Sequence, residues 1–103
     1  MNYSPQGWIA QKDPGVVERA ITNVEDNDPE MIHVYANGDP YFGLWLVLVD
    51  VRVRRFAGVA VTDLTDWMSR DCYEAGMTPR EGAIEALSND DLYAQHLAEL
   101  GIK

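Results

Sequence analysis

The stretch at residues 39–58, DPYFGLWLVLVDVRVRRFAG, decides the fold. Asp39 and Pro40 are typical of a helix start, because an aspartate oxygen accepts a free backbone N–H and proline has no N–H to leave unpaired. Gly58 is a typical helix stop. Between these signals, apolar side chains recur at helical spacing on one face, and the opposite face is apolar as well. We therefore predict a central helix over residues 40–57, surrounded by the rest of the chain.

The same stretch leaves a second interpretation open. Apolar and charged residues alternate from Val49 to Arg54, and valine favours β-strands. The alternative fold is therefore α+β, with residues 44–61 as strands. The Asp-Pro start, the glycine stop and the 18-residue length favour the helix. A strand would also lack a clear partner, since only residues 59–61 look extended nearby.

Similar helix starts recur along the chain. Asp13-Pro14 and Asp28-Pro29 repeat the Asp-Pro form, and residues 78–81, Thr-Pro-Arg-Glu, form a capping box. The predicted outer helices cover residues 14–24, 29–36, 66–75, 79–87 and a last segment that begins after Ser88. The fold class that we predict is all-α, a compact bundle of five or six short helices around the central apolar helix.

Length and composition favour one domain over residues 1–103. Residues 1–12 are predicted to be a loosely packed N-terminal arm, because Trp8 and Ile9 are its only apolar anchors. Cys72 is the only cysteine, so no disulfide can form within the chain, which suits a reducing cytoplasm. The start of the chain does not resemble a secretory signal, and the longest apolar run is too short to span a bilayer. We therefore expect a cytoplasmic protein without a membrane segment.

The chain is strongly acidic, with 17 acids, 8 bases and a net charge of −9. The excess is larger in the second part, where residues 59–103 carry nine acids and three bases. Such a surface repels nucleic acid and anionic membranes and favours basic partners. We predict a non-enzymatic protein-interaction module that binds a protein partner through an acidic surface. The candidate interaction residues are Asp63, Asp66, Asp90, Asp91, Arg54 and Arg55.

Three other functions stay open. The first is a DNA mimic that occupies a nucleic-acid-binding protein. The second is a helix-turn-helix DNA-binding regulator built from residues 66–75 and 79–87. Its second helix offers only Arg80 to DNA, beside Glu81 and Glu85, so direct binding of nucleic acid is not expected. The third is a homo-oligomer that packs through exposed aromatic side chains.

No pattern predicts catalysis, a cofactor or a metal site. The spacings Glu30-x-x-His33 and His96-x-x-Glu99 each place two possible ligands on one helix face, but a di-metal bundle needs further buried glutamates. Cys72 lies near Asp71 and Glu74, which disfavour a reactive thiolate. We expect no enzyme activity and a packed thiol.

Residues 58–67, GVAVTDLTDW, and the pattern Asp71-x-Tyr73-x-x-Gly76-Met-Thr-Pro79-Arg-Glu81 resemble a segment of uncharacterised small proteins of actinobacteria and their phages. The resemblance covers about a third of the chain. It implies a phage-associated origin. Small acidic accessory proteins of phages often bind and redirect a host protein, so the resemblance also implies a phage-encoded modulator.

Overall fold

The computed structural model describes residues 3–102, and over these residues the chain is helical with no strand. The six α-helices are α1 (Gly7–Ala10), α2 (Pro14–Asn27), α3 (Pro40–Ala57), α4 (Ser69–Glu74), α5 (Pro79–Ser88) and α6 (Asp91–Glu99). A π-helical turn, η1 (Met31–Tyr35), precedes α3, and a 3-10 turn, η2 (Val61–Asp63), follows it. The all-α prediction is confirmed, and the strand alternative for residues 44–61 is wrong.

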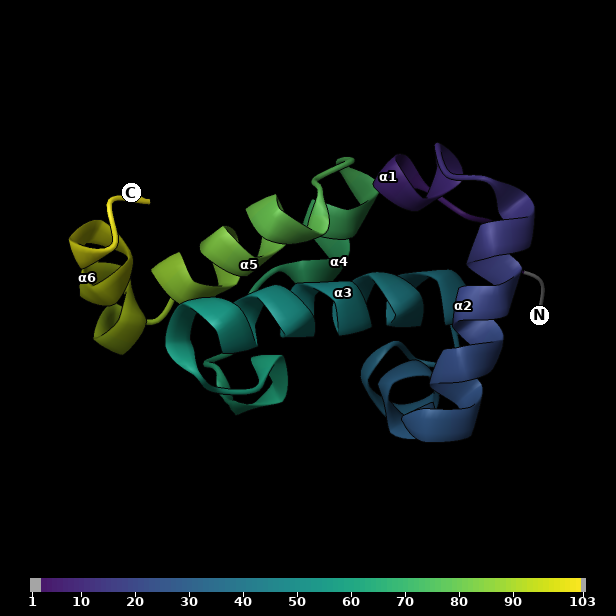
Figure 1. The fold of residues 1–103 in the computed structure, drawn as a ribbon, viewed down its shortest axis with the longest axis horizontal. Helices are drawn as coiled ribbons and strands as arrows, with labels where there is room; N and C mark the ends of the chain where they lie inside the picture. The colour runs from purple at the N-terminus through teal and green to yellow at the C-terminus, as the bar shows by residue number, and fades with distance from the viewer. Residues whose placement is uncertain (1–2, 103) are drawn as a thin grey trace.

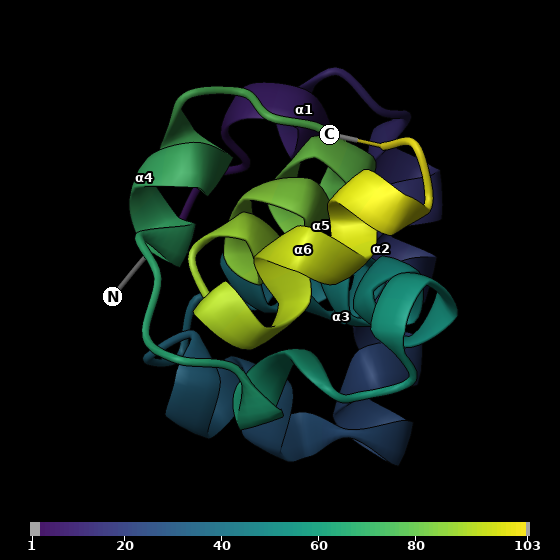
Figure 2. The same ribbon diagram turned by 90° about the vertical axis from the view of Figure 1, so that its left-hand side faces the viewer.

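The helix α3 runs along the middle of the molecule, with α2 across one end and α6 at the other (Figure 1). Its predicted bounds, 40–57, are confirmed. Trp45, Val49 and Val53 on this helix are completely buried. Gly58 ends the helix with a left-handed φ of 71°, and its N–H donates to the Arg54 carbonyl at 2.9 Å. A view along the bundle shows α5 beside α3 (Figure 2).

Most of the predicted caps are present. The Asp13 carboxylate accepts the Val16 N–H, and Thr78 and Glu81 form the reciprocal capping box at α5. Asp39 caps α3 by accepting the N–H groups of Tyr41 and Phe42. Asp28 is the exception, because α2 continues to Asn27 and Asp28 becomes the residue that ends it, with its N–H 2.7 Å from the Val24 carbonyl.

The start of α4 differs from the prediction. This helix begins at Ser69, not near residue 66, and no side chain caps it. The Asp63 carboxylate accepts the Ala60 N–H at 3.2 Å and so closes η2, and the Thr65 hydroxyl donates to Asp90 at 3.0 Å. Asp63 and Thr65, the two residues before it that could have capped this helix, therefore make other contacts.

The cap of α6 is Asp90, not Ser88, because α5 continues through Ser88. The Asp90 carboxylate accepts the Leu92 N–H at 3.0 Å.

Part of the predicted N-terminal arm is packed. Residues 1 and 2 lie outside the described residues, but Ile9 in α1 is 1% exposed and belongs to the core. The Gln6 N–H donates to the Tyr73 hydroxyl in α4 at 3.1 Å. Burial of Ile9 provides the apolar contact that keeps this short helix on the bundle.

A buried carboxylate joins α3 to α4. Asp39 is 1% exposed, and its second oxygen lies 2.7 Å from Nη1 of Arg70. Arg70 also pairs with Glu74 at 2.8 Å, and its guanidinium lies over the ring of Phe42 at 5.1 Å. Partial burial alone would lower the pKa of Arg70, but the hydrogen bonds to Glu74 and Asp39 outweigh it and raise the pKa. Arg70 therefore stays charged opposite Asp39 in the folded protein.

Substitution of Asp39 tests this joint. Asp39→Asn keeps an oxygen for the cap but removes the charge opposite Arg70, and we expect a loss of about 2 kcal/mol in unfolding free energy. The matched control is Asp28→Asn, which changes the other Asp-Pro aspartate, the one that caps no helix. Urea unfolding followed by circular dichroism measures both. Equal losses of unfolding free energy in the two variants would show that the Asp39–Arg70 ion pair does not stabilise the contact between α3 and α4.

Close packing against Trp45 fixes α5 on α3. The indole N–H of Trp45 donates to the Met77 carbonyl at 3.0 Å. Gly82 of α5 faces the same ring so closely that a Cβ there would lie 2.7 Å from Cη2 and 2.8 Å from Cζ2. Any larger residue at position 82 must push α5 away from α3.

The substitution Gly82→Ala therefore destabilises the protein by about 1–2 kcal/mol, although alanine is the better helix former by roughly 1 kcal/mol. The control is Gly15→Ala in α2, where a Cβ meets only the ends of flexible side chains, Asp13 and Arg19. Gly15→Ala is expected to be neutral or stabilising. Thermal unfolding compares the two, and a Gly82→Ala protein as stable as Gly15→Ala would disprove the packing argument.

Candidate functional site

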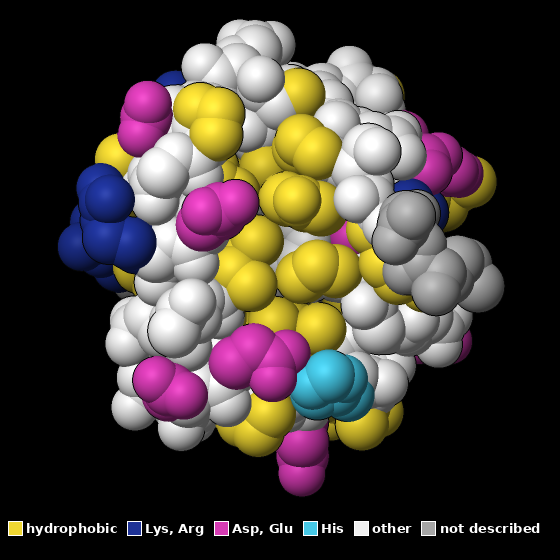
Figure 3. Space-filling view, turned by 90° about the vertical axis from the view of Figure 1, so that its right-hand side faces the viewer, with side chains coloured by type: hydrophobic (Ala, Val, Ile, Leu, Met, Phe, Trp, Pro, Cys, Tyr) yellow, Lys and Arg dark blue, Asp and Glu magenta, His cyan; other side chains and the backbone are white. Residues whose placement is uncertain are grey.

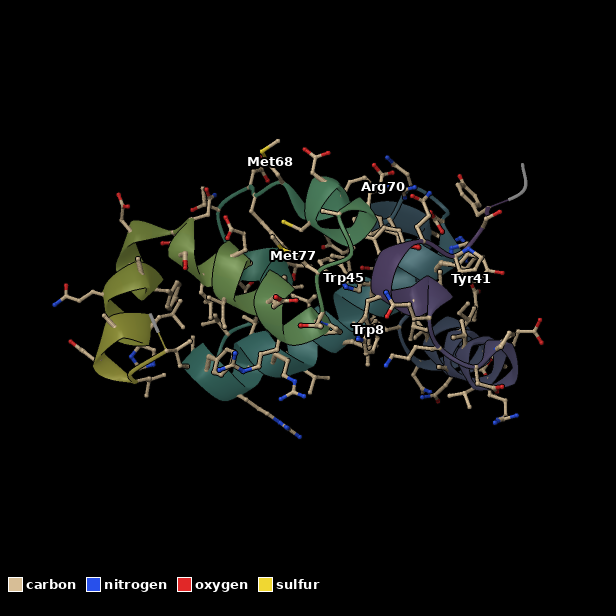
Figure 4. All side chains as sticks on the ribbon, turned by 90° about the horizontal axis from the view of Figure 1, so that it is seen from above. Trp8, Tyr41, Trp45, Met68, Arg70 and Met77 are labelled. Atoms are coloured by element: carbon tan, nitrogen blue, oxygen red, sulfur yellow. The ribbon has the colours of Figure 1, made fainter. Side chains whose placement is uncertain are left out.

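An apolar and acidic surface lies along the connection between η2 and α4. We call it the Trp67 face and define it by Asp66, Trp67, Met68, Asp71 and Glu85. The connection runs along the outside of the bundle (Figure 2). Trp67 is half-buried, with its ring centroid 6.1 Å from that of Trp45, whereas Met68 is 71% exposed. Figure 4 shows Met68 projecting from the edge of the molecule.

The turn between α5 and α6 holds this connection in place. The side-chain amide of Asn89 donates to the Asp66 carbonyl at 2.7 Å. Asp90 accepts the Thr65 hydroxyl, and Leu64 is buried beneath the chain. Residues 64–66 are therefore anchored without a helix, which leaves Met68 facing solvent directly beside them.

Trp67 separates two hollows. One has a volume of about 220 Å³, and Met31, Leu46 and Asp66 are among the residues that line it. The other has a volume of about 310 Å³, and Met68, Asp71, Met77 and Glu85 line much of it. Among residues 3–102, no lysine or arginine lines either hollow. Carboxylates are the only charged side chains that line the hollows in this part of the chain, and Trp67, Met68 and Met77 add apolar surface beside them. Such a surface suits a ligand that is both basic and apolar.

Cys72 lines the second hollow but is buried. Burial raises the pKa of its thiol, and the negative charges of Glu85 and Asp71 raise it further. The thiol is therefore protonated at neutral pH and lacks the thiolate that nucleophilic chemistry requires.

The four predicted acidic residues have different roles. Asp66 lines the first hollow, and Asp91 is exposed in the first turn of α6. Asp63 and Asp90 instead hold backbone groups in place. Only Asp66 of the four therefore belongs to the Trp67 face.

The two predicted arginines lie elsewhere. Arg54 pairs with Asp50 at 2.9 Å, and this hydrogen bond raises the pKa of the guanidinium. Arg55 lines a separate cleft with Arg52 and Arg80. Neither arginine lines the hollows of the acidic surface.

Sequence reasoning missed Met68, Asp71 and Glu85 as surface residues of one site. The predicted helix over 66–75 included Trp67 and Met68, whereas in the structure both precede α4, which begins at Ser69. The available signal was the segment of residues 63–68, where threonine and aspartate surround apolar residues, a composition that favours a loop.

The histidines face single partners. His33 lies 2.9 Å from Glu25, not beside Glu30. Nε2 of His96 lies 2.8 Å from the Phe56 carbonyl, which can only accept, so this nitrogen carries the proton. Within residues 3–102, no group of three or more His, Cys, Asp or Glu side chains is arranged to hold a metal ion. In the same part of the chain, no helix is long and apolar enough to cross a membrane.

The end of the molecule at α2 shows a second type of surface. Hydrophobic side chains gather at its centre, with carboxylates and one histidine around them (Figure 3). A hollow between α1, α2 and Tyr41 has a volume of only about 80 Å³. It is smaller than either hollow beside Trp67 and mixes Lys12 with Glu18, so it gives no clear preference for a partner.

Comparison with known proteins identifies relatives from phages. The chain is 37% identical over 49 residues to the Gene 87 protein of Mycobacterium phage D29, a match that covers 48% of this chain and 91% of that protein. It is 33% identical over 51 residues to the Gene 87 protein of Mycobacterium phage L5, covering 50% of this chain and 96% of that protein. The chain belongs to the family of these phage Gene 87 proteins. No family model and no solved structure matches it.

The phage resemblance inferred from residues 58–81 is therefore confirmed. The Gene 87 relatives are almost completely covered, but they match only about half of this chain.

The hydrogen bonds of Asp90 predict a pH effect on stability. The Leu92 N–H and the Thr65 hydroxyl lower the pKa of its carboxyl group. A lowered folded-state pKa gives stabilisation that is present above the unfolded value, about 3.9, and is lost as the pH falls through the folded one. We expect Asp90→Ala to melt several degrees below wild type at pH 7. This difference in melting temperature should become smaller below about pH 4.

The control for this effect is Asp91→Ala, which removes the neighbouring carboxylate but not the cap. It is expected to change the melting temperature less at pH 7. Circular dichroism melts between about pH 3 and pH 7 measure the effect. A gap for Asp90→Ala that stays constant over this range would show that the charge of Asp90 contributes nothing.

Proposed function

We propose that this protein is a non-enzymatic interaction module, a phage-encoded modulator that binds a host protein through the Trp67 face. The observation that carries the proposal is Met68, an apolar side chain 71% exposed, among Asp66, Asp71 and Glu85 with no base lining the hollows beside it in residues 3–102. Single exposed apolar side chains are common on protein surfaces, and what distinguishes Met68 is that it lines a hollow together with Trp67, Asp71 and Glu85.

The surface suits a basic segment that carries an apolar anchor. Trp67 offers a large, half-buried ring. Tryptophan is enriched among the residues that dominate binding energy. Met68 can adapt its shape to an apolar side chain, because methionine is unbranched and polarisable. Lysines or arginines of the partner would meet Asp66, Asp71 and Glu85 at the rim, where charge pairs set the rate and specificity of association.

The family membership supports the phage origin that this proposal assumes. Both relatives come from phages of mycobacteria, so host proteins are the partners that such a protein meets. A basic host protein is expected to be attracted from a distance as well, since the chain carries a net charge of −9.

The DNA-mimic alternative would use the same surface but predicts a different kind of partner. A DNA mimic would select a nucleic-acid-binding protein and be displaced by DNA. The helix-turn-helix alternative gains little support, because α5 presents Arg80 beside Glu81 and Glu85 and buries its other side against α3 and α6. The DNA mimic requires a nucleic-acid-binding partner and the regulator requires a basic recognition helix. The interaction module requires only the Trp67 face.

Affinity capture from a mycobacterial lysate, with mass spectrometry, tests the proposal. The test variant is Asp66→Lys with Glu85→Lys, which reverses two charges on the Trp67 face. The matched control is Asp26→Lys with Glu99→Lys, which reverses two exposed charges elsewhere. Met68→Ser and Leu92→Ser form a second pair, because Leu92 is 74% exposed and lines neither hollow.

We expect a protein that is captured by the wild type and both controls but is reduced roughly tenfold with the two test variants. Binding of the purified partner to each variant must then follow the same order. Equal capture by all variants would rule out the Trp67 face. Release of the partner by double-stranded DNA would favour the DNA mimic instead.

A further inference from the structure

Trp8 lies on the other side of Trp45 from Met68 (Figure 4), and a groove in two parts surrounds it. Its first part is an apolar trough of about 400 Å³ between α1, α2 and α3, where Val16, Val17 and Leu44 are among the lining residues. Its second part is a cleft of about 410 Å³ lined by Arg52, Arg55 and Arg80, among others. The two parts share Trp8 and Leu48, so they form one continuous surface, the Trp8 groove.

The arginines of this groove are not held in ion pairs. Three of the six arginines of the chain line the cleft, and within residues 3–102 none of the three takes part in an ion pair. Arg80 only lies over the Phe56 ring, at 6.0 Å. Of the nearby carboxylates, Asp50 pairs with Arg54, and Glu81 accepts the Thr78 N–H while its charge also attracts Arg80 without forming an ion pair. In a protein with so many acids, three unpaired arginines in one cleft indicate a site for an anionic ligand.

The trough presents apolar side chains to solvent. Val16 is 52% exposed, and Val51 at the cleft is 43% exposed. Lys12 adds a fourth positive charge at the rim, with its Nζ 4.3 Å from the centre of the Trp8 ring. The trough and the cleft together match a ligand with an apolar stripe next to carboxylates.

We propose that the Trp8 groove binds an acidic amphipathic helix of a partner protein. The apolar face of such a helix lies in the trough against Trp8, Val16 and Leu44, and its flanking carboxylates pair with the arginines of the cleft. A single-stranded nucleic acid fits less well, because the trough offers Lys12 as its one lysine or arginine, beside Asp13, and the net charge of −9 repels a polyanion. The site is independent of the Trp67 face.

The three tryptophans provide separate reporters for a test by NMR. Trp8 reports on the groove, Trp67 on the acidic surface, and Trp45, completely buried, on the core. The probe is a designed peptide of about 18 residues, roughly five helical turns, with leucine on one face and glutamate on the flanks. A peptide of the same composition in shuffled order, without the apolar stripe, is its control.

Two matched pairs of variants locate the binding. Arg55→Glu reverses a charge in the cleft, and Arg19→Glu reverses one on α2 that does not line the groove. Val16→Asp introduces a charge into the trough, and Val34→Asp does so at a valine of similar exposure, 60%, outside it. Fluorescence anisotropy with labelled peptide measures the affinity of each folded variant.

We expect the designed peptide to shift the Trp8 indole signal and leave that of Trp67 in place. Arg55→Glu and Val16→Asp should each weaken binding roughly tenfold, while Arg19→Glu and Val34→Asp change it little. An unchanged Trp8 signal at millimolar peptide, or equal binding of the shuffled peptide, would overturn the proposal. So would tighter binding of a thymidine oligonucleotide, or of phosphatidylglycerol vesicles, that is lost in the same two variants.

Discussion

The structure depends on one carboxylate, that of Asp39. One of its oxygens satisfies the first N–H groups of α3, and the other holds Arg70 of α4 at 2.7 Å. Because a charge is costly to bury without partners, these contacts fix where α4 can lie relative to the start of α3. Arg70 then lies over Phe42 and Tyr73, so the same charge also aligns aromatic rings from both helices.

A cluster of aromatic rings connects this buried ion pair to the surface. Trp45 packs between Phe42, Tyr73 and Trp67, with ring centroids about 6 Å apart. Its indole N–H is bonded to the backbone after α4, and its ring occupies the space that a side chain at Gly82 would need. Trp67 is thus held on one side by a rigid core while its other side borders two hollows. A preorganised anchor of this kind loses little entropy on binding.

Local signals in the sequence predicted much of the fold. The bounds of α3 and the caps at Asp13, Asp39 and Thr78 depend only on neighbouring residues, so a sequence pattern predicts them well. The segment before α4 is held by a bond between Thr65 and Asp90, 25 positions apart, which no local pattern shows. For the same reason, the grouping of Asp71 and Glu85 with Asp66, and the separate cleft around Arg55, emerged only from packing.

The two proposed surfaces have opposite charge on one acidic molecule, and this shapes how each would find its ligand. At physiological salt, exposed charges are screened over about 8 Å, so the net charge acts weakly on a distant partner and the charges of the local site dominate at contact. A basic partner of the Trp67 face is attracted at every stage. An acidic helix is repelled until it reaches Arg52, Arg55 and Arg80, so its association depends on the apolar trough and gains from screening. Charge therefore speeds the association of a basic partner with the Trp67 face, whereas binding of an acidic helix to the Trp8 groove must depend mainly on apolar burial.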